Sequence, residues 1–172
     1  EAASRYCRRR GFLVAGDLQG FTRAFFEDGT VYFKQPEEEL FKFLDVVKGS
    51  EREIKIATRC DSIKEALARI AAFGPRIVMA TLGERGALLF SKGRLLRVYP
   101  LKAEVVVDPT GAGDAFVASF LIGFLWSMKL EDCLKLACSA ATCVIERKLP
   151  LGDADRDYII ERSAKVRVER LA

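Results

Sequence analysis

The sequence predicts an α/β protein in which a largely parallel sheet is covered by helices on both faces. Segments 44–48 and 76–81 are short apolar runs without polar alternation, which is typical of strands buried on both faces of a parallel sheet. Segments with helical signals alternate with the strands along the chain. Glycine-containing loops follow several strands, and the loop at 108–114 directly precedes a long apolar helix.

The first half of the chain carries clear helix boundaries between its strands. Pro36 and the acidic residues after it predict the start of a short helix. Ser62 and Glu65 form a capping-box pattern, and Gly74-Pro75 ends the helix that follows. The elements expected before residue 76 are a strand at 12–17 that ends in a turn, an edge strand at 30–34, a short helix at 37–43, a buried strand at 44–48, a helical segment from Ser50 and a helix from about 62 to 73.

The second half begins with the buried strand at 76–81 and contains the longest apolar segment of the chain. That segment, AFVASFLIGFLW at 115–126, is apolar on all sides, which predicts a central, buried helix. The other elements expected here are short strands at 87–90, 95–100 and 104–107 and helices at 114–128, 131–147 and within 153–168.

Length and composition indicate a soluble globular protein with one main domain. The chain has 172 residues, of which 50% are hydrophobic and 30% are charged. We expect a basic arm at 1–11 and a single domain at 12–172. The net charge of +4 is small, and no interleaved aromatic and basic pattern accompanies the basic arm, so a nucleic-acid partner is not favoured.

Histidine is absent and five cysteines are present. A Ser-His-Asp triad, a Cys-His pair and His-ligated metal sites are therefore excluded within this chain. Cys133, Cys138 and Cys143 recur at a spacing that turns by roughly 140° on a helix, so they cannot converge on one ion and are expected to be buried. The longest apolar run is shorter than the ~20 residues of a membrane span, and no signal peptide is visible. We expect a cytoplasmic protein without a membrane partner.

The loop DPTGAGD at 108–114 is the strongest candidate for chemistry. Gly111 and Gly113 permit backbone conformations and close approaches that other residues do not. The amides there precede a helix, where free N–H groups and the helix dipole favour an anion. Two interpretations remain open for Asp114 from the residues alone: a helix cap in a tight turn, or a base beside an anion site.

Four segments, in order along the chain, resemble motifs of the PfkB, or ribokinase-like, carbohydrate kinases. DPTGAGDAFVASF resembles the second signature of that family, and IVMATLGERGALLF resembles its nucleotide loop. LDVVKGSEREI resembles the strand before its Asn-x-x-Glu magnesium motif, and LVAGDLQGFTR resembles a strand of archaeal-type members. The resemblance implies a ribokinase-like fold and transfer of the γ-phosphate of ATP, with Mg²⁺, to a hydroxyl of a sugar or nucleoside.

The resemblance also implies roles for individual residues. Asp114 is the catalytic base that accepts the proton of the acceptor hydroxyl. The remaining implied roles are an anion hole at Gly111, Ala112 and Gly113; ATP binding by Thr81, Gly83, Gly86, Ala137 and Ala141; magnesium binding through water by Glu53; and a monovalent cation such as K⁺ at Asp108 and Thr110.

The chain departs from the family pattern in two ways. Ser50 stands where the magnesium motif has Asn, so Ser50 and Glu53 can equally be read as a capping box. The resemblance also covers about the C-terminal half of such a kinase, so we expect the fold to be incomplete on its N-terminal side. A complementing N-terminal half or self-association is then the expected partner.

The residue pattern leaves two alternatives to an active kinase for comparison. A non-catalytic nucleotide-binding or regulatory remnant of the same fold stays open, because the acceptor-binding half is not in the sequence. A dinucleotide-binding dehydrogenase is disfavoured, because the glycine loop lacks the G-x-G-x-x-G spacing and does not follow the first strand.

Overall fold

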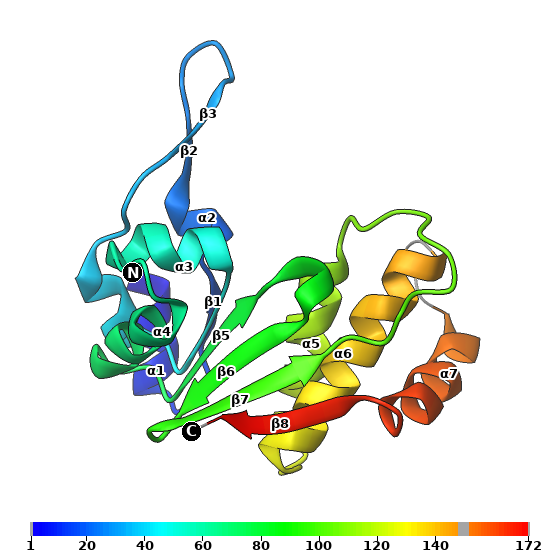
Figure 1. Cartoon of the computed structure of the whole chain (residues 1–172). Coiled ribbons are helices and arrows are strands. Elements are labelled where there is room, and N and C mark those ends of the chain that lie inside the picture. Colours follow the sequence, from blue (N-terminus) through cyan, green and yellow to red (C-terminus); the bar gives the residue numbers. More distant parts are fainter. Residues whose placement is uncertain (1, 148–151, 172) are drawn as a thin grey trace. The chain divides into compact units, whose positions relative to one another are not determined.

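The computed structural model describes residues 2–147 and 152–171, which form two compact units. The first unit runs to Gly83 and also includes Leu88–Leu95 and Leu171. The second unit consists of Glu84–Ala87 and Leu96–Arg170. The ribbon in Figure 1 labels the elements of both units.

The first unit is built on parallel strands. Strand β1 (Ala15–Asp17) pairs with β4 (Val46–Ser50), and β4 pairs with β5 (Ile77–Thr81), all in parallel. Strand β6 (Ala87–Ser91) lies next to β5, and the start of β7 (Arg94–Tyr99) lies next to β6. The helices of this unit are α1 (Ala2–Arg9), α2 (Gln19–Thr22), the 3₁₀ helix η1 (Glu38–Phe43), α3 (Glu51–Thr58) and α4 (Ile63–Ala72).

The core of the first unit confirms the predicted buried strands. Val47 and Val78 are fully buried and pack in one cluster with side chains of the helices, including Phe41, Ile54 and Leu67. Ser62 caps α4 by accepting a hydrogen bond from the Glu65 amide, and the helix ends just before Gly74-Pro75. Helix–sheet packing of this kind fixes the carboxyl ends of the strands, where polar loops begin.

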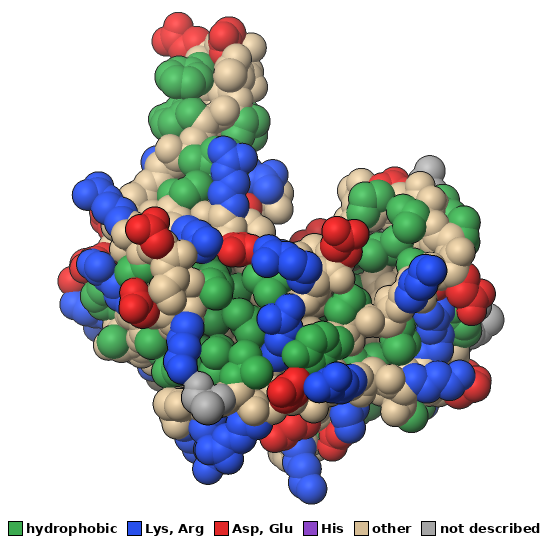
Figure 2. Space-filling model, viewed as in Figure 1, with side chains coloured by type: hydrophobic (Ala, Val, Ile, Leu, Met, Phe, Trp, Pro, Cys, Tyr) green, Lys and Arg blue, Asp and Glu red, His purple; other side chains and the backbone are tan. Residues whose placement is uncertain are grey.

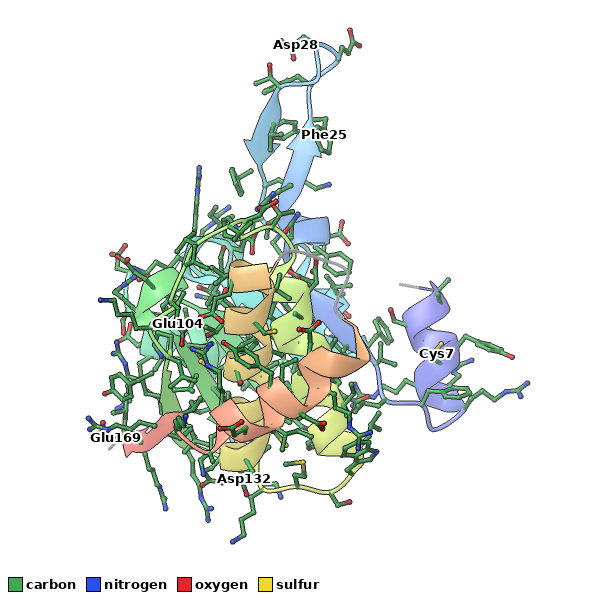
Figure 3. The ribbon with its side chains drawn as sticks, turned by 90° about the vertical axis from the view of Figure 1, so that its right-hand side faces the viewer. Cys7, Phe25, Asp28, Glu104, Asp132 and Glu169 are labelled. Carbon is green, nitrogen blue, oxygen red and sulfur yellow. The ribbon has the colours of Figure 1, made fainter. Side chains whose placement is uncertain are left out.

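A two-stranded hairpin belongs to the first unit but not to its main sheet. Strand β2 (Arg23–Phe25) pairs antiparallel with β3 (Val31–Phe33). The space-filling view shows acidic side chains at its tip and hydrophobic side chains along its strands (Figure 2). Figure 3 shows Asp28 at that tip and Phe25 on the strand below it.

The second unit consists mainly of helices. Helix α5 (Ala112–Leu125) packs against α6 (Leu130–Arg147), which packs against α7 (Asp153–Ser163). A Cβ atom on Gly123 would lie 3.2 Å from the Cys133 sulfur, so this glycine permits the close approach of α5 and α6. The short helix η2 (Gly83–Arg85) begins at Gly83, which belongs to the first unit, and continues into the second. Strand β7 lies next to β8 (Arg167–Leu171).

The three cysteines of α6 are buried, as the sequence predicts. Burial raises the pKa of the Cys133 and Cys138 thiols to about 11, so both are protonated at neutral pH. In the part of the chain that the structure describes, no helix is long and apolar enough to cross a membrane.

Several sequence-based expectations are wrong. Residues 104–107 form no strand; Val105, Val106 and Val107 are exposed, and the Val107 amide donates to the Ile145 carbonyl of α6 instead of to a sheet. Helix α5 is not buried on all sides, because Ile122 and Leu125 are 45% and 66% exposed. The turn after 12–17 is the short helix α2, and strands β2 and β8 were not expected.

The predicted fold class is confirmed. The core strands of the sheet are parallel and helices accompany them. The predicted arm at 1–11 contains helix α1.

Candidate functional site

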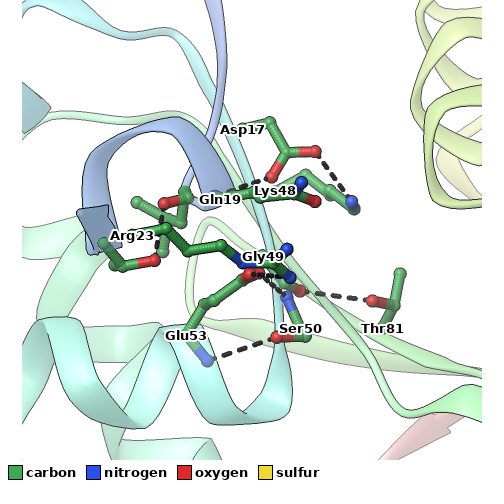
Figure 4. Close-up of polar contacts among 10 residues, drawn as sticks. Asp17, Gln19, Arg23, Lys48, Gly49, Ser50, Glu53 and Thr81 are labelled. Atoms are coloured by element: carbon green, nitrogen blue, oxygen red, sulfur yellow. Dashed lines mark hydrogen bonds and ion pairs between the residues drawn. The ribbon is translucent and has the colours of Figure 1, made fainter. Parts of the chain in front are cut away.

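In the first unit, the carboxyl ends of parallel strands bring polar side chains together. The register places Asp17 opposite Lys48 on β1 and β4, and Ser50 opposite Thr81 on β4 and β5. Parallel strands present their carboxyl ends at one edge of the sheet, where ligands bind in open α/β sheets. Figure 4 shows these residues with Glu53 and Arg23 in one cluster.

Ser50 and Glu53 form a complete capping box at the start of α3. The Ser50 amide donates to Glu53 Oε2 at 2.8 Å, and the Glu53 amide donates to Ser50 Oγ at 3.3 Å (Figure 4). This confirms the capping interpretation of the S-x-x-E pattern. Glu53 is only 3% exposed, so its carboxylate is fixed in direction.

The second carboxylate oxygen of Glu53 faces a cation. Arg23 Nη2 donates to Glu53 Oε1 at 3.2 Å. Both carboxylate oxygens therefore already accept hydrogen bonds, and the neighbouring guanidinium opposes a second cation in direct contact. The contact through a water molecule that the family resemblance implies for Glu53 stays a prediction.

The sequence did not lead to a partly buried ion pair next to this cluster. Lys48 Nζ donates to Asp17 Oδ2 at 2.7 Å, and the Lys48 side chain is only 7% exposed. Asp17 Oδ1 also accepts the Gln19 amide at 3.0 Å. The signal was available, because a lysine inside the buried run LDVVK needs a partner and Asp17 ends the strand that pairs with it.

The two glycines of the TLGERG loop have different environments. Gly83 has a positive φ of 62° with open space around it. Gly86 has a positive φ of 87°, and a Cβ atom there would lie 2.0 Å from the Val98 carbonyl oxygen of β7. Close packing against β7 therefore accounts for Gly86. Thr81 ends β5 and donates its hydroxyl to the Gly49 carbonyl at 3.5 Å.

In the second unit, the DPTGAGD loop forms an open helix N-terminus. Gly111 is the N-cap of α5 with φ 81°, and no side chain caps the helix. The first i to i−4 bond runs from the Ala115 amide to the Gly111 carbonyl, and the Ala112 amide donates to the Pro109 carbonyl at 3.2 Å. The N–H groups of Gly113 and Asp114 thus have no acceptor within the helix.

Asp114 is exposed in the first turn of α5. It is not a helix cap, so the capping interpretation of this residue is wrong. Its carboxylate lies in the same turn as the two N–H groups that have no helical acceptor, and helix N-termini of this kind can bind anions. Asp108 accepts the Thr110 amide at 2.8 Å, which closes the turn before this helix.

Hydrogen bonds fix the loop before α5 to the neighbouring helices. The Glu104 amide donates to Glu146 Oε1 at 2.8 Å, and Tyr158 and Arg162 donate to Glu146 Oε2 at 2.8 and 2.6 Å. Burial tends to raise the pKa of Glu146, but the hydrogen bonds from Arg162, the Glu104 amide and Tyr158 outweigh it and lower that pKa. Glu146 therefore stays ionised and joins the loop to α6 and α7.

The two alanines predicted to line the adenine differ in exposure. Ala137 is fully buried, whereas Ala141 is partly exposed. Among the described residues, no group of three or more Cys, Asp or Glu side chains is arranged to hold a metal ion. Of the predicted site residues, Glu53 and Thr81 lie in one cluster of the first unit (Figure 4). Asp108, Thr110 and Asp114 lie in one loop of the second unit.

A family model described as pfkB family carbohydrate kinase matches residues 22–155. The chain belongs to this family. A cytidine kinase from Thermococcus kodakarensis is 34% identical over 110 residues, which cover 63% of this chain and 40% of that kinase. A ribokinase from Arabidopsis thaliana is 31% identical over 116 residues, or 64% of this chain and 31% of that protein. The chain thus spans less than half the length of these two relatives.

Solved structures of the family have the same fold. The structure of Arabidopsis thaliana ribokinase complexed with ribose and ATP matches 93% of this chain and 50% of that chain, with a TM-score of 0.78 and 25% identity. A pyrophosphate-dependent kinase in the ribokinase family, complexed with a pyrophosphate analogue and myo-inositol, matches 90% of this chain and 56% of that chain, with a TM-score of 0.79 and 27% identity.

Proposed function

We propose that the chain carries the phosphoryl-donor site and the catalytic carboxylate of a kinase that phosphorylates a hydroxyl of a sugar or a nucleoside. The observation that carries the proposal is the N-terminus of α5. There Asp114 is exposed beside two N–H groups without helical acceptors, within the signature that resembles the family's catalytic motif.

In this proposal the residues of the loop act directly on the reacting atoms. Asp114 accepts the proton of the acceptor hydroxyl as the oxygen–phosphorus bond forms and the bond to the leaving phosphate breaks. The N–H groups of Gly111, Gly113 and Asp114 donate to the oxygens of the transferring group. Ala112 contributes only if its bond to the Pro109 carbonyl opens. Because the transition state is loose, positioning and charge stabilisation matter more than base strength.

Cations would support the negative charge of the donor. Mg²⁺ neutralises phosphate oxygens when it is bound, and Glu53 would hold one of its water ligands. Asp108 and Thr110 supply carboxylate and carbonyl oxygens, which suit a hard cation such as K⁺. Thr81, Gly83 and Gly86 would hold the nucleotide, with Ala141 nearer the adenine than the buried Ala137.

The relatives support the proposed donor and acceptor. Arabidopsis ribokinase is described with ribose and ATP, whereas another structural neighbour is pyrophosphate-dependent. We propose ATP as the donor and a sugar or nucleoside as the acceptor. Since the matched relatives are longer, we also propose that acceptor binding needs a complementing N-terminal half or a second copy, and that the protein works in the cytoplasm.

The test combines binding and turnover on this chain. Titration calorimetry measures ATP and pyrophosphate binding, each with Mg²⁺, and product formation is assayed with ribose, fructose, cytidine, adenosine and myo-inositol. If the chain binds neither ATP nor pyrophosphate, the proposal is contradicted. Because acceptor binding is proposed to need a complementing half or a second copy, donor binding without turnover by this chain alone agrees with this proposal and also with a second candidate, a non-catalytic nucleotide-binding domain, which the short span of the chain relative to its relatives favours.

Substitution of the proposed base separates the two candidates further. Asp114→Asn keeps the size of the side chain but removes the proton acceptor. We expect turnover to fall about 10²-fold or more, with donor binding and melting temperature unchanged. The matched control is Asp157→Asn, an exposed aspartate of α7, which should leave turnover intact. Equal turnover in both variants refutes the role of Asp114.

A further inference from the structure

The buried carboxylate of Glu53 has a counter-ion that comes from the β2–β3 hairpin. Glu53 Oε1 accepts a hydrogen bond from Arg23 Nη2 at 3.2 Å, and Glu53 Oε2 accepts the Ser50 amide at 2.8 Å (Figure 4). A carboxylate as buried as this one is costly to hold without a compensating charge. The Arg23 guanidinium supplies that charge.

The two partners of this ion pair differ in how easily they can return to water. The Arg23 side chain is 40% exposed, whereas the Glu53 side chain is 3% exposed. The pair is joined by one hydrogen bond from Nη2 to Oε1, which is weaker than the two parallel bonds of a bidentate pair. Arg23 can therefore leave at little cost in solvation, but Glu53 then needs another cation.

Arg23 also belongs to the root of the hairpin. It is the first residue of β2 and pairs with Phe33, the last residue of β3. The Arg52 guanidinium lies 3.9 Å from the centre of the Phe33 ring. Two consecutive residues of α3, Arg52 and Glu53, thus each contact one strand of the hairpin. The contact between Arg23 and Glu53 is the one of these two that involves the proposed magnesium motif.

We propose that Arg23 competes with a divalent metal ion for Glu53, so that metal binding loosens the root of the hairpin. The inference rests on the proposed role of Glu53 in magnesium binding. Two cations beside one carboxylate repel each other, so the ion pair with Arg23 weakens metal binding. Because coupling between two equilibria is reciprocal, metal binding weakens the ion pair by the same factor. Arg23 is then a positioning residue that sets the affinity of the metal site.

A purely structural role for Arg23 gives a different expectation. If the guanidinium only compensates a buried carboxylate, its removal lowers the stability of the fold and leaves metal affinity unchanged. If it competes with the metal ion, its removal lowers stability and also raises metal affinity. The two roles are therefore separated by a measurement of metal binding, without any catalytic turnover.

Titration with Mn²⁺, followed through the electron paramagnetic resonance signal of the free ion, provides this measurement. We expect Arg23→Gln to bind Mn²⁺ about ten-fold more tightly than the unaltered chain, which is within the usual range for coupled sites. The double variant Arg23→Gln/Glu53→Gln should lose this gain. Arg23→Lys keeps the positive charge and should stay close to the unaltered chain. It also gives a readout if Arg23→Gln folds poorly.

Arg52→Gln is the matched control. Arg52 is exposed, precedes Glu53 in the chain and makes its contact with Phe33, so this variant changes the net charge equally but leaves the ion pair intact. Its Mn²⁺ affinity should change much less than that of Arg23→Gln. Melting temperatures give a second readout, because Mn²⁺ should stabilise Arg23→Gln more than it stabilises the unaltered chain at the same concentration.

Hydrogen exchange tests the link to the hairpin. The Lys34 amide donates to the Thr22 carbonyl at 2.8 Å and closes the root of the hairpin. We expect Mg²⁺ to speed exchange at Lys34 in the unaltered chain. In Arg23→Gln this amide should exchange faster without metal, and Mg²⁺ should have no further effect.

Three results overturn the inference: equal Mn²⁺ affinity of Arg23→Gln and the unaltered chain, equal effects of Arg23→Gln and Arg52→Gln, or exchange at Lys34 that does not respond to Mg²⁺. The proposed function survives each of them, because it is tested by binding of ATP or pyrophosphate. A chain that binds neither Mn²⁺ nor either donor contradicts both the inference and the proposed function.

Discussion

At the scale of single residues, Gly86 shows how a family motif can be required for packing. Both Gly83 and Gly86 have positive φ angles, but only Gly86 lies against another backbone, with the Val98 carbonyl 2.0 Å from the position of an added Cβ. That carbonyl belongs to β7, so it cannot move aside as a flexible side chain would. The structural demand at Gly86 holds whether or not a nucleotide binds.

Substitution of each glycine by alanine separates backbone strain from close packing. Gly83→Ala adds a side chain in open space at a positive φ, which should cost roughly 1 kcal/mol of unfolding free energy. Gly86→Ala adds the clash with β7 and should cost about 3 kcal/mol. Urea denaturation of both variants measures the difference. Equal costs would show that β7 shifts freely and that packing does not explain Gly86.

At the scale of elements, Glu146 of α6 links α7 and the irregular segment before α5 through hydrogen bonds. It accepts hydrogen bonds from the Glu104 amide, Tyr158 and Arg162, and the Arg162 guanidinium also donates to the Lys102 carbonyl at 3.4 Å. Two N–H groups of the segment, at Val107 and Asp108, donate to the Ile145 carbonyl as well. These bonds replace a strand ladder for residues 102–108.

Because the pKa of Glu146 is lowered in the folded protein, the stability contributed by these hydrogen bonds should depend on pH. A carboxylate whose pKa is lower in the folded state stabilises the fold above its unfolded pKa of about 4.3. That stabilisation is lost as the pH falls through the folded pKa. Glu146→Gln should therefore lower the unfolding free energy by about 2 kcal/mol at pH 7, and the difference from the unaltered chain should shrink below about pH 4.

Denaturation from pH 3 to pH 7 measures this effect. Glu161→Gln, at an exposed position of α7, is the control and should change stability little at any pH. A Glu146→Gln variant as stable as the control at pH 7 would show that the network around Glu146 does not hold the segment before α5.

The elements that the sequence predicts well are those with strong local signals. The buried runs ending at Lys48 and Thr81 and the helix starts at Ser50 and Ser62 carry apolar patterning and capping residues, and the structure confirms them. The segment 104–107 is β-branched, but its backbone donates to α6, a partner distant in sequence. Tertiary hydrogen bonds of this kind override strand propensity.

The candidate site was predictable to a similar extent. The DPTGAGD pattern led to the helix end at Gly111, and the capping box at Ser50 was among the alternatives. The pairs Lys48–Asp17 and Arg23–Glu53 were missed. In both pairs the partners are about 30 residues apart in sequence, and only strand register and the hairpin bring them together.

At the scale of the whole molecule, the proposed donor-binding residues belong to both compact units. Protection by a ligand can be measured in each unit by itself. In the second unit, we expect ATP with Mg²⁺ to slow hydrogen exchange at the amides of Gly113 and Asp114, because these N–H groups have no helical acceptor and would donate to phosphate. In the first unit, the segment around Thr81 and Gly83 should be protected if it holds the nucleotide.

Titration with ATP and Mg²⁺ should also raise the free energy of unfolding, and the size of this increase can be predicted. A ligand at 100 times its dissociation constant raises the unfolding free energy by about 2.7 kcal/mol when it binds only the folded state. Asp114→Asn should retain both this stabilisation and the slowed exchange, because it removes the proton acceptor but keeps the backbone N–H groups. If ATP binds measurably but does not slow exchange at the α5 N-terminus, the phosphates must bind elsewhere. Asp114 would then have no support as the base.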